Sequence, residues 1–147
     1  MVDRPILVAV DFEEASRRVL LTAQTIARGL GAPIALVHVY RLPLYTYPAL
    51  EVVPVPPPIA FAPELAAAAG KALSTFADTY GISPDLTFIR EGDPADEILA
   101  AAAEIDARLI AMGTHGRRGL SHVLLGSVAE QVVRRSRAPV LTVRVSP

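Results

Sequence analysis

The sequence predicts an α/β domain in which a parallel sheet of five strands carries helices on both faces. The chain has 147 residues, about the length of one domain. Five short apolar runs have the length of buried strands, and they alternate with segments whose apolar residues recur at helical spacing. Such alternation forms parallel sheets through right-handed crossovers, so we expect a single doubly wound, Rossmann-like sandwich over residues 1–147.

Composition supports a packed core and excludes several classes of protein. Hydrophobic residues make up 52% of the chain and charged residues 20%, which excludes disorder of the whole chain. The absence of cysteine excludes disulfides, thiolate metal sites and a cysteine nucleophile. Aromatic residues make up only 5% and the net charge is −1, so we expect no nucleic-acid partner. Asp3 and Arg4 interrupt any apolar leader, and we expect a cytoplasmic protein.

The first part of the chain predicts a βαβ unit. Residues 5–10 and 32–39 are apolar runs that indicate strands buried on both faces. Residues 13–30 between them predict a helix that ends at Gly29 or Gly31. The residues of this helix that we expect to face the sheet are Ala15, Val19, Ala23, Ile26, Ala27 and Leu30.

A proline-rich loop is expected at residues 43–63. Residues 42–63 carry one charge, Glu51, but hold seven of the thirteen prolines, which excludes a membrane-spanning helix. Because the loop also holds apolar side chains, we hypothesise that it folds over a ligand or docks a protein partner. The apolar residues of the loop are Tyr45, Tyr47, Val52, Val53, Ile59 and Phe61.

The second part of the chain continues the alternation. Residues 63–80 predict a helix, residues 86–89 a strand, and Asp93 followed by Pro94 a capped start of the next helix. Residues 109–112 predict the fourth strand, 127–136 the fourth helix and 139–145 the last strand. We expect the strand order 3-2-1-4-5, which places the ligand site beyond the carboxyl ends of the first and fourth strands.

The segment between the fourth strand and the last helix predicts phosphate binding. Residues 113–127 hold four of the nine glycines, which let main-chain amides approach an anion at a helix N-terminus. The spacing is neither the Gly-Lys-Ser/Thr phosphate loop nor Gly-x-Gly-x-x-Gly, and the only lysine is Lys71. Those two nucleotide-binding classes are therefore excluded.

The spacing Gly113-x2-Gly116-x9-Gly126-Ser127 resembles the ATP-binding signature of the universal stress protein family. Residues 8–11, 36–39, 91–96 and 138–143 are also similar to that family, so the resemblance covers the chain apart from the proline-rich loop. It implies the fold of the adenine nucleotide alpha hydrolase-like proteins. It also implies ATP as ligand, with Mg²⁺ or Mn²⁺ held mainly by the phosphates.

The resemblance also implies a role for individual residues. Asp11 and the main chain of Val39 would hold the adenine. The passage for the ribose and phosphates would be lined by Met112, Gly113 and Gly116. Arg117 would be the charge partner of the phosphates. Hydrogen-bond donors to the phosphates would come from Gly126, Ser127 and Val128. One departure is the acidic Glu13 after the first strand, which would repel phosphates if it faced them.

The same residues have structural explanations. Asp11 with Glu14, and Ser127 with Glu130, both fit helix capping boxes. The three glycines could serve turns alone, and a packed core residue is the favoured interpretation of His38. His115 and His122 lack a second ligand at metal spacing, so no metal site within the protein is expected. Positive charge suits a helix end, which makes a solvated face the favoured interpretation of Arg134, Arg135 and Arg137.

The leading hypothesis is a small ATP-binding stress-response protein that binds nucleotide without rapid turnover. The resemblance implies a homodimer through the last strand, Val140 to Val145, and an apolar edge strand gives a physical reason for it, although Arg144 and Pro147 could blunt that edge. The alternatives are a slow ATPase or self-phosphorylating protein and a regulatory dimer that binds no nucleotide. No catalytic residue is assigned.

Overall fold

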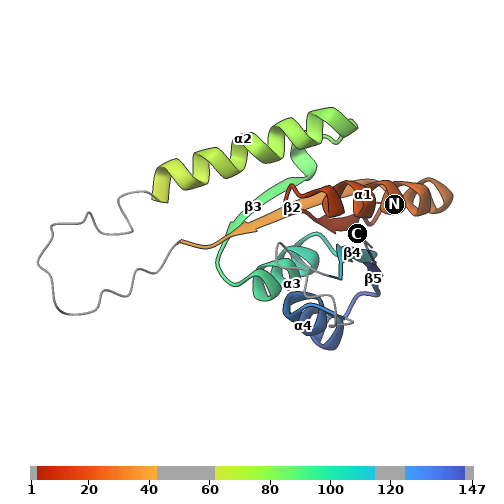
Figure 1. The fold of residues 1–147 in the computed structure, drawn as a ribbon. Helices are drawn as coiled ribbons and strands as arrows, with labels where there is room; N and C mark the ends of the chain where they lie inside the picture. Colours follow the sequence, from red (N-terminus) through yellow and green to blue (C-terminus); the bar gives the residue numbers. More distant parts are fainter. Residues whose placement is uncertain (1–2, 43–61, 115–124, 145–147) are drawn as a thin grey trace, which may run out of the picture.

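The structure is a computed structural model that describes residues 3–42, 62–114 and 125–144. A five-stranded parallel sheet has the order β3-β2-β1-β4-β5, as predicted (Figure 1). Its strands are β1 (Ile6–Ala9), β2 (Ile34–Tyr40), β3 (Thr87–Glu91), β4 (Leu109–Gly113) and β5 (Val140–Val143). The α-helices are α1 (Glu14–Leu30), α2 (Ala62–Tyr80), α3 (Pro94–Glu104) and α4 (Ser127–Arg135).

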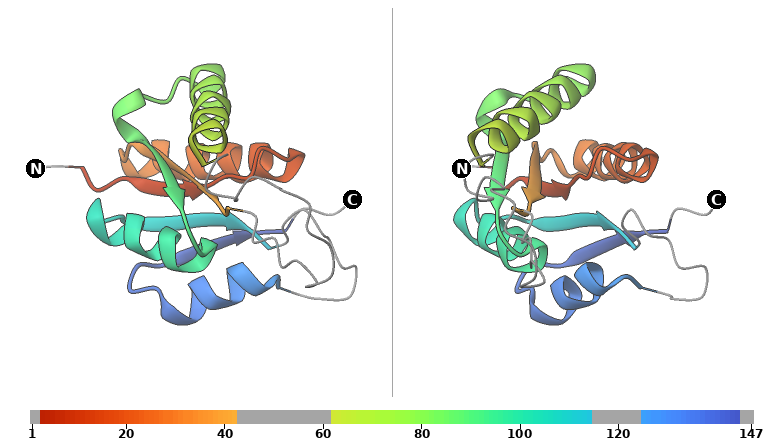
Figure 2. Two further views of the ribbon diagram at one scale, coloured as in Figure 1. Left: turned by 90° about the vertical axis from the view of Figure 1, so that its left-hand side faces the viewer. Right: turned by 60° about the vertical axis from the view of Figure 1, so that its left-hand side comes forward.

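The sheet is covered on both faces. Helices α1 and α2 lie on one face, and α3 and α4 lie on the other (Figure 2). Successive residues of β1 alternate between the two cores: Ile6 and Val8 pack under α1, while Leu7 packs against the layer of α3 and α4. All three are fully buried, which explains why this strand is a continuous apolar run.

Main-chain hydrogen bonds at three prolines connect the amino ends of neighbouring strands. We call the side of the sheet where the strands begin the amino edge, and the side where they end the carboxyl edge. Pro5, Pro33 and Pro139 immediately precede β1, β2 and β5, where proline's missing N–H costs no sheet hydrogen bond. Their carbonyls accept hydrogen bonds from Arg108, Ile6 and Ile110 at 2.8, 2.9 and 2.9 Å. The start of each of these strands is therefore tied to a neighbour.

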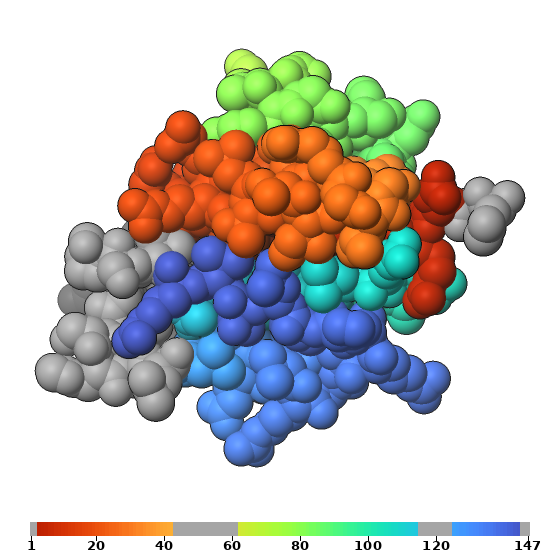
Figure 3. Space-filling view, turned by 90° about the vertical axis from the view of Figure 1, so that its right-hand side faces the viewer, coloured from red at the N-terminus to blue at the C-terminus, as the bar shows by residue number. Residues whose placement is uncertain are grey.

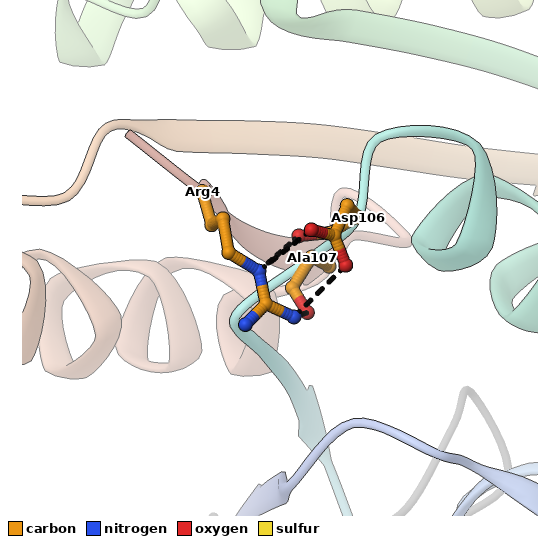
Figure 4. Close-up of polar contacts among 3 residues, drawn as sticks. All are labelled: Arg4, Asp106 and Ala107. Atoms are coloured by element: carbon orange, nitrogen blue, oxygen red, sulfur yellow. Dashed lines mark hydrogen bonds and ion pairs between the residues drawn. The ribbon is translucent and has the colours of Figure 1, made fainter. Parts of the chain in front are cut away.

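A side-chain clamp adds to this edge (Figure 4). The Arg4 guanidinium donates to both the carbonyl and the carboxylate of Asp106, at 3.1 and 2.9 Å, and to the carbonyl of Ala107 at 3.5 Å. Asp106 has a φ of 48°, a conformation that aspartate tolerates better than most residues. The clamp joins the residues before β1 to the turn before β4.

Helix boundaries depart from the sequence predictions in small ways. Helix α1 ends at Gly31, whose φ of 63° closes the last turn, so the preceding Leu30 is 44% exposed rather than inward-facing. A short 3₁₀ turn, η2 (Pro84–Leu86), takes the first residue of the predicted third strand. Residues 43–61 of the predicted loop lie outside the described residues, and α2 begins at Ala62. None of the described helices combines the length and apolar character that a membrane span needs.

Candidate functional site

Most residues of the predicted site lie at the carboxyl edge of the sheet. Asp11 follows β1, Val39 lies near the end of β2, and Met112 and Gly113 end β4. Gly126 is the N-cap of α4, and Ser127 and Val128 are its first two residues. The remaining predicted residues, Gly116 and Arg117, lie outside the described residues, as do His115 and His122.

Thr114 joins three parts of this edge. Its N–H donates to the carbonyl of Val143 at the end of β5 (3.2 Å), and its carbonyl accepts from the N–H of Gly126 (2.5 Å). Thr114 is 6% exposed. The end of β4, the end of β5 and the start of α4 are therefore held together, which brings Gly113 and Gly126 close although they are far apart in sequence.

The N-terminus of α4 presents main-chain donors at this edge. The first intrahelical hydrogen bond runs from the N–H of Glu130 to the carbonyl of Gly126 (2.9 Å), so the amides of the first turn have no partner inside the helix. Ser127 is exposed and is the first helical residue, so the alternative interpretation as a capping box of Ser127 with Glu130 does not hold. Gly126 is the N-cap, and glycine has no capping side chain. The exposed Ser127 hydroxyl and these amides together suit an anion.

Asp11 occupies the turn between β1 and α1, and the helix cap that the sequence left open as one interpretation of it does not form. The N-cap is Glu13, without a side-chain capping bond, so a capping box of Asp11 with Glu14 does not form. Instead, Oδ1 of Asp11 accepts hydrogen bonds from the hydroxyl of Ser16 (2.6 Å) and from the N–H of Glu13 (3.1 Å). Asp11 as a residue is half-buried at the carboxyl edge.

The main chain of Val39 points to the place where β1 ends. The N–H of Val10 donates to the carbonyl of Val37 at 2.9 Å, so the main-chain groups of Val37 face β1. Residues two apart in a parallel strand direct their main-chain groups to the same side. The main-chain groups of Val39 therefore also face the β1 side. Because β1 ends at Ala9, which pairs with Val37, they face the segment after β1, where Asp11 lies.

An aromatic cluster supports the turn that carries Asp11. The ring of Phe12 lies 4.3 Å from the ring of His38 and 6.0 Å from that of Phe76, measured between centroids, and Phe76 in turn contacts Tyr80. Nδ1 of His38 is hydrogen-bonded to the carbonyl of Val10 at 2.7 Å. His38 is thus a packed, hydrogen-bonded residue, in agreement with the favoured structural interpretation.

Phe12 has a φ of 67°, which is rare for a bulky residue. Such a conformation persists only where the surroundings hold it, and here the aromatic contacts do so. The contacts that Phe12 and Ser16 make around Asp11 were not predicted from the sequence. The only sequence signal for Ser16 was a polar residue on the apolar face of α1, since neither residue belongs to the glycine signature.

Charged residues near the ends of β2 and β3 form ion pairs. Arg41 pairs with Asp93 at 2.5 Å, and Asp93 also caps α3 by accepting from the N–H of Asp96 at 3.2 Å, as predicted. On α4, Arg134 pairs with Glu130 at 2.9 Å and Arg135 with Asp96 at 2.7 Å. These exposed pairs agree with a solvated face on α4. Within residues 3–42, 62–114 and 125–144, no group of three potential ligand side chains is placed to hold a metal ion.

Two hollows in the described surface are lined mainly by residues of α1 and α2. One, of about 530 Å³, runs along α2 and includes Phe12, Phe76 and Tyr80. The other, of about 320 Å³, lies near the end of α1 and includes Gln24 and Gly31. Neither of these two hollows is lined by Asp11, Val39, residues 112–113 or residues 126–128.

The fold and this edge define a doubly wound α/β domain with an anion-attracting helix N-terminus beside the point where the strand order reverses. The model of the universal stress protein family matches residues 4–144, so the chain belongs to that family. Universal stress protein YxiE of Bacillus subtilis is 32% identical over 145 residues, covering 94% of this chain and 97% of that relative. The resemblance found in the sequence is thereby confirmed at the level of the family.

Other relatives match over a shorter part. Universal stress protein MJ0531 of Methanocaldococcus jannaschii is 43% identical over 74 residues, which are 50% of this chain and 43% of that relative. The match to the universal stress protein E homolog of Haemophilus influenzae covers 46% of this chain and 22% of that relative. These matches thus cover less than half the length of each of the two relatives.

Solved structures agree with the fold. Universal stress protein UspA from Lactobacillus plantarum superimposes with a TM-score of 0.75 at 26% identity, covering 98% of this chain and 99% of that one. A universal stress protein in complex with cAMP superimposes with a TM-score of 0.61 at 26% identity, covering 99% of this chain and all of the other.

Proposed function

We propose that this chain is a cytoplasmic adenine-nucleotide-binding protein of the stress response, acting as a single domain over residues 1–147 with ATP as its ligand. The observation that carries the proposal is the arrangement of the carboxyl edge: an acceptor at Asp11, main-chain groups at Val39, and anion-attracting amides at the start of α4. The solved relative in complex with cAMP supports an adenine nucleotide. Binding, rather than turnover, is the proposed activity.

In this arrangement the base lies at the ends of β1 and β2, and the phosphates lie at α4. The Asp11 carboxylate accepts from the base, while the Val39 main chain offers a donor and an acceptor. Met112 and Gly113 lie between the two ends, followed along the chain by Gly116 and Arg117. Ser127 and Val128 donate to the phosphates. Gly126 was predicted as a third donor, but its N–H is bonded to the Thr114 carbonyl, so its role is to leave room for the phosphates to approach the helix.

A divalent cation fits this donor set only as a companion of the phosphates. Mg²⁺ prefers oxygen ligands and retains several waters. The exposed Ser127 hydroxyl is a described side-chain oxygen at the phosphate end, so phosphate oxygens and water would hold Mg²⁺ or Mn²⁺ with at most about one or two side-chain oxygens of the protein. Such an ion would neutralise phosphate charge.

The experiment is to denature the purified protein and identify any released nucleotide by mass spectrometry, followed by titration with ATP. The test variant is Gly126→Val. Gly126 has a φ of −67°, so its backbone conformation does not require glycine, and a valine side chain there should block the approach of phosphate to the amides. Circular dichroism and urea denaturation check that the variant is folded. We expect the wild type to bind ATP and the variant to lose at least about tenfold in affinity, the equivalent of one to two charge-assisted hydrogen bonds. A wild type that neither carries nor binds ATP contradicts the proposal.

We also propose that the protein is a homodimer through β5, within Val140 to Val145. Strand β5 is an edge of the sheet and lies between α1 and α4 (Figure 3). Its residues are only half-buried, and the flanking helices expose Leu21 (39%) and Val133 (46%). Light scattering after size exclusion tests this: Thr142→Pro removes an N–H from the strand, and it should give monomers if the dimer pairs through β5.

A further inference from the structure

A buried hydroxyl lies directly behind the carboxylate proposed to contact the base. Ser16 is 4% exposed and lies in the first turns of α1, on the side that faces the sheet. Its hydroxyl accepts a hydrogen bond from the N–H of Asp11 (2.8 Å) and donates one to Oδ1 of the same residue (2.6 Å). Ser16 thus holds Asp11 at two points, through its main chain and through its side chain.

These bonds leave the two carboxylate oxygens of Asp11 in different states. Oδ1 accepts from both Ser16 and the N–H of Glu13. Oδ2 has no hydrogen-bond partner among the described residues, and Asp11 as a residue is half-buried at the carboxyl edge. Because an ionised carboxylate only accepts hydrogen bonds, Oδ2 offers a fixed acceptor to a ligand that carries a donor.

The turn is also fixed from the other side. Phe12 follows Asp11 in its φ of 67°, and its ring packs against His38, which is itself bonded to the carbonyl of Val10. A strained residue held by such contacts prevents the turn from relaxing, so the carboxylate is oriented before a ligand arrives.

We infer that Ser16 is a positioning residue that gives this site its preference for a 6-amino purine. The inference rests on the proposed function, because it assigns base selectivity to the same site. The amino group of adenine donates to Oδ2 of Asp11. A 6-oxo purine such as hypoxanthine places an acceptor at that position, and two acceptors repel each other in the absence of a shared proton. Ser16 imposes the preference because without it the carboxylate can turn away.

The experiment compares the binding of ATP and inosine triphosphate, which share the same triphosphate and differ at the base. We expect the wild type to prefer ATP, and Ser16→Ala to reduce that preference about 3- to 10-fold, the effect of one hydrogen bond. Ser16→Thr keeps the hydroxyl and should restore the preference. The matched control is Thr22→Ala, which removes an exposed hydroxyl that donates to Arg18 on the same helix (2.9 Å) and should leave the preference unchanged.

A second variant tests the geometry without emptying the buried position. In Asp11→Asn, the two donors at Oδ1 require the amide oxygen there, which leaves the amide N–H₂ at the position of Oδ2. A donor then replaces the acceptor, so the preference should invert towards inosine triphosphate. In the double variant Asp11→Asn with Ser16→Ala, one of the donors that fixes the amide is removed, and the inversion should weaken.

The outcomes separate the inference from the proposed function. If Ser16→Ala weakens both nucleotides equally, Ser16 is merely structural and the inference is overturned. Equal binding of ATP and inosine triphosphate by the wild type, or an unchanged preference in Asp11→Asn, also overturns it while the proposed function stands. A wild type that binds no ATP contradicts the proposed function itself, and the inference with it.

Discussion

The two edges of the same sheet differ in how their polar groups are used. At the amino edge, the carbonyls of Pro5, Pro33 and Pro139 accept hydrogen bonds from neighbouring strands, and Arg4 clamps Asp106. At the carboxyl edge, the first amides of α4 have no partner within the helix, and Oδ2 of Asp11 has none among the described residues. These amino-edge groups are paired within the protein, whereas these carboxyl-edge groups are the ones that we propose contact a ligand.

Backbone strain follows the same division. Phe12, at the carboxyl edge, has a bulky side chain at a φ of 67°, whereas Asp106, at the amino edge, is a residue type that accepts its φ of 48°. Of the two described non-glycine residues with a positive φ, the one at the carboxyl edge is therefore the more strained. Substitutions at the amino edge should therefore change stability, and substitutions at the carboxyl edge should change binding.

The largest expected effect comes from the core at the amino edge. Ile6 begins β1, is fully buried, and pairs with Ile34 on one side and Leu109 on the other. Ile6→Ala should lower the free energy of unfolding by about 2–5 kcal/mol, measured by urea denaturation, because it leaves a cavity in the central strand. Ile6→Val, the conservative control, should cost about 0.5–1.5 kcal/mol.

The same variants test the division between the edges. In the folded protein, Ile6→Ala should leave ATP affinity within about twofold of wild type, because distant sites act independently. A parallel loss of affinity and stability would break the comparison, since it would mean that the amino edge also shapes the ligand site.

The fold could be predicted because parallel strands buried on both faces appear in the sequence as continuous apolar runs. Neighbouring residues such as Leu7 and Val8 face opposite cores, and both are apolar. The strand therefore lacks the alternation of polar and apolar residues that is typical of a strand with one exposed face. The strand order and the four α-helices were predicted from the alternation of elements, and the structure confirms both. Ends were less predictable: Leu30 fits the apolar face by spacing, yet it follows the last turn that packs on the sheet.

The candidate site could be predicted where it depends on glycine and on the ends of strands. Gly126 and Asp11 were selected in that way, and their role in binding stays a prediction. The capping boxes, left open as alternatives at both helices, do not form, because a capping pattern does not specify where the helix begins. The roles of Ser16 and Phe12 depend on side-chain geometry and on a positive φ, and neither has a sequence signature. Such features arise only from tertiary packing.

A smaller effect should reveal the strain at Phe12. Phe12→Ala loses ring contacts with His38 and Phe76 and should lower the free energy of unfolding by about 1–3 kcal/mol. Phe12→Gly loses the same contacts but accepts the positive φ, so it should be about 1 kcal/mol more stable than Phe12→Ala. Glycine is normally the less stable of the two, so urea denaturation of this pair tests the sign directly. An alanine variant as stable as the glycine variant would show that the turn carries no strain.

The smallest effect is expected at the clamp of the amino edge. The side chains of Arg4 and Asp106 are 54% and 76% exposed, so solvent screens their ion pair strongly. Arg4→Ala should cost at most about 1 kcal/mol in urea denaturation, and less at high salt. Asp106→Asn keeps a residue type suited to a φ of 48° and removes only the charge, so it should cost no more than Arg4→Ala. A cost that is larger and independent of salt would mean that the Arg4 hydrogen bonds to the carbonyls of Asp106 and Ala107, rather than the charges, close this edge.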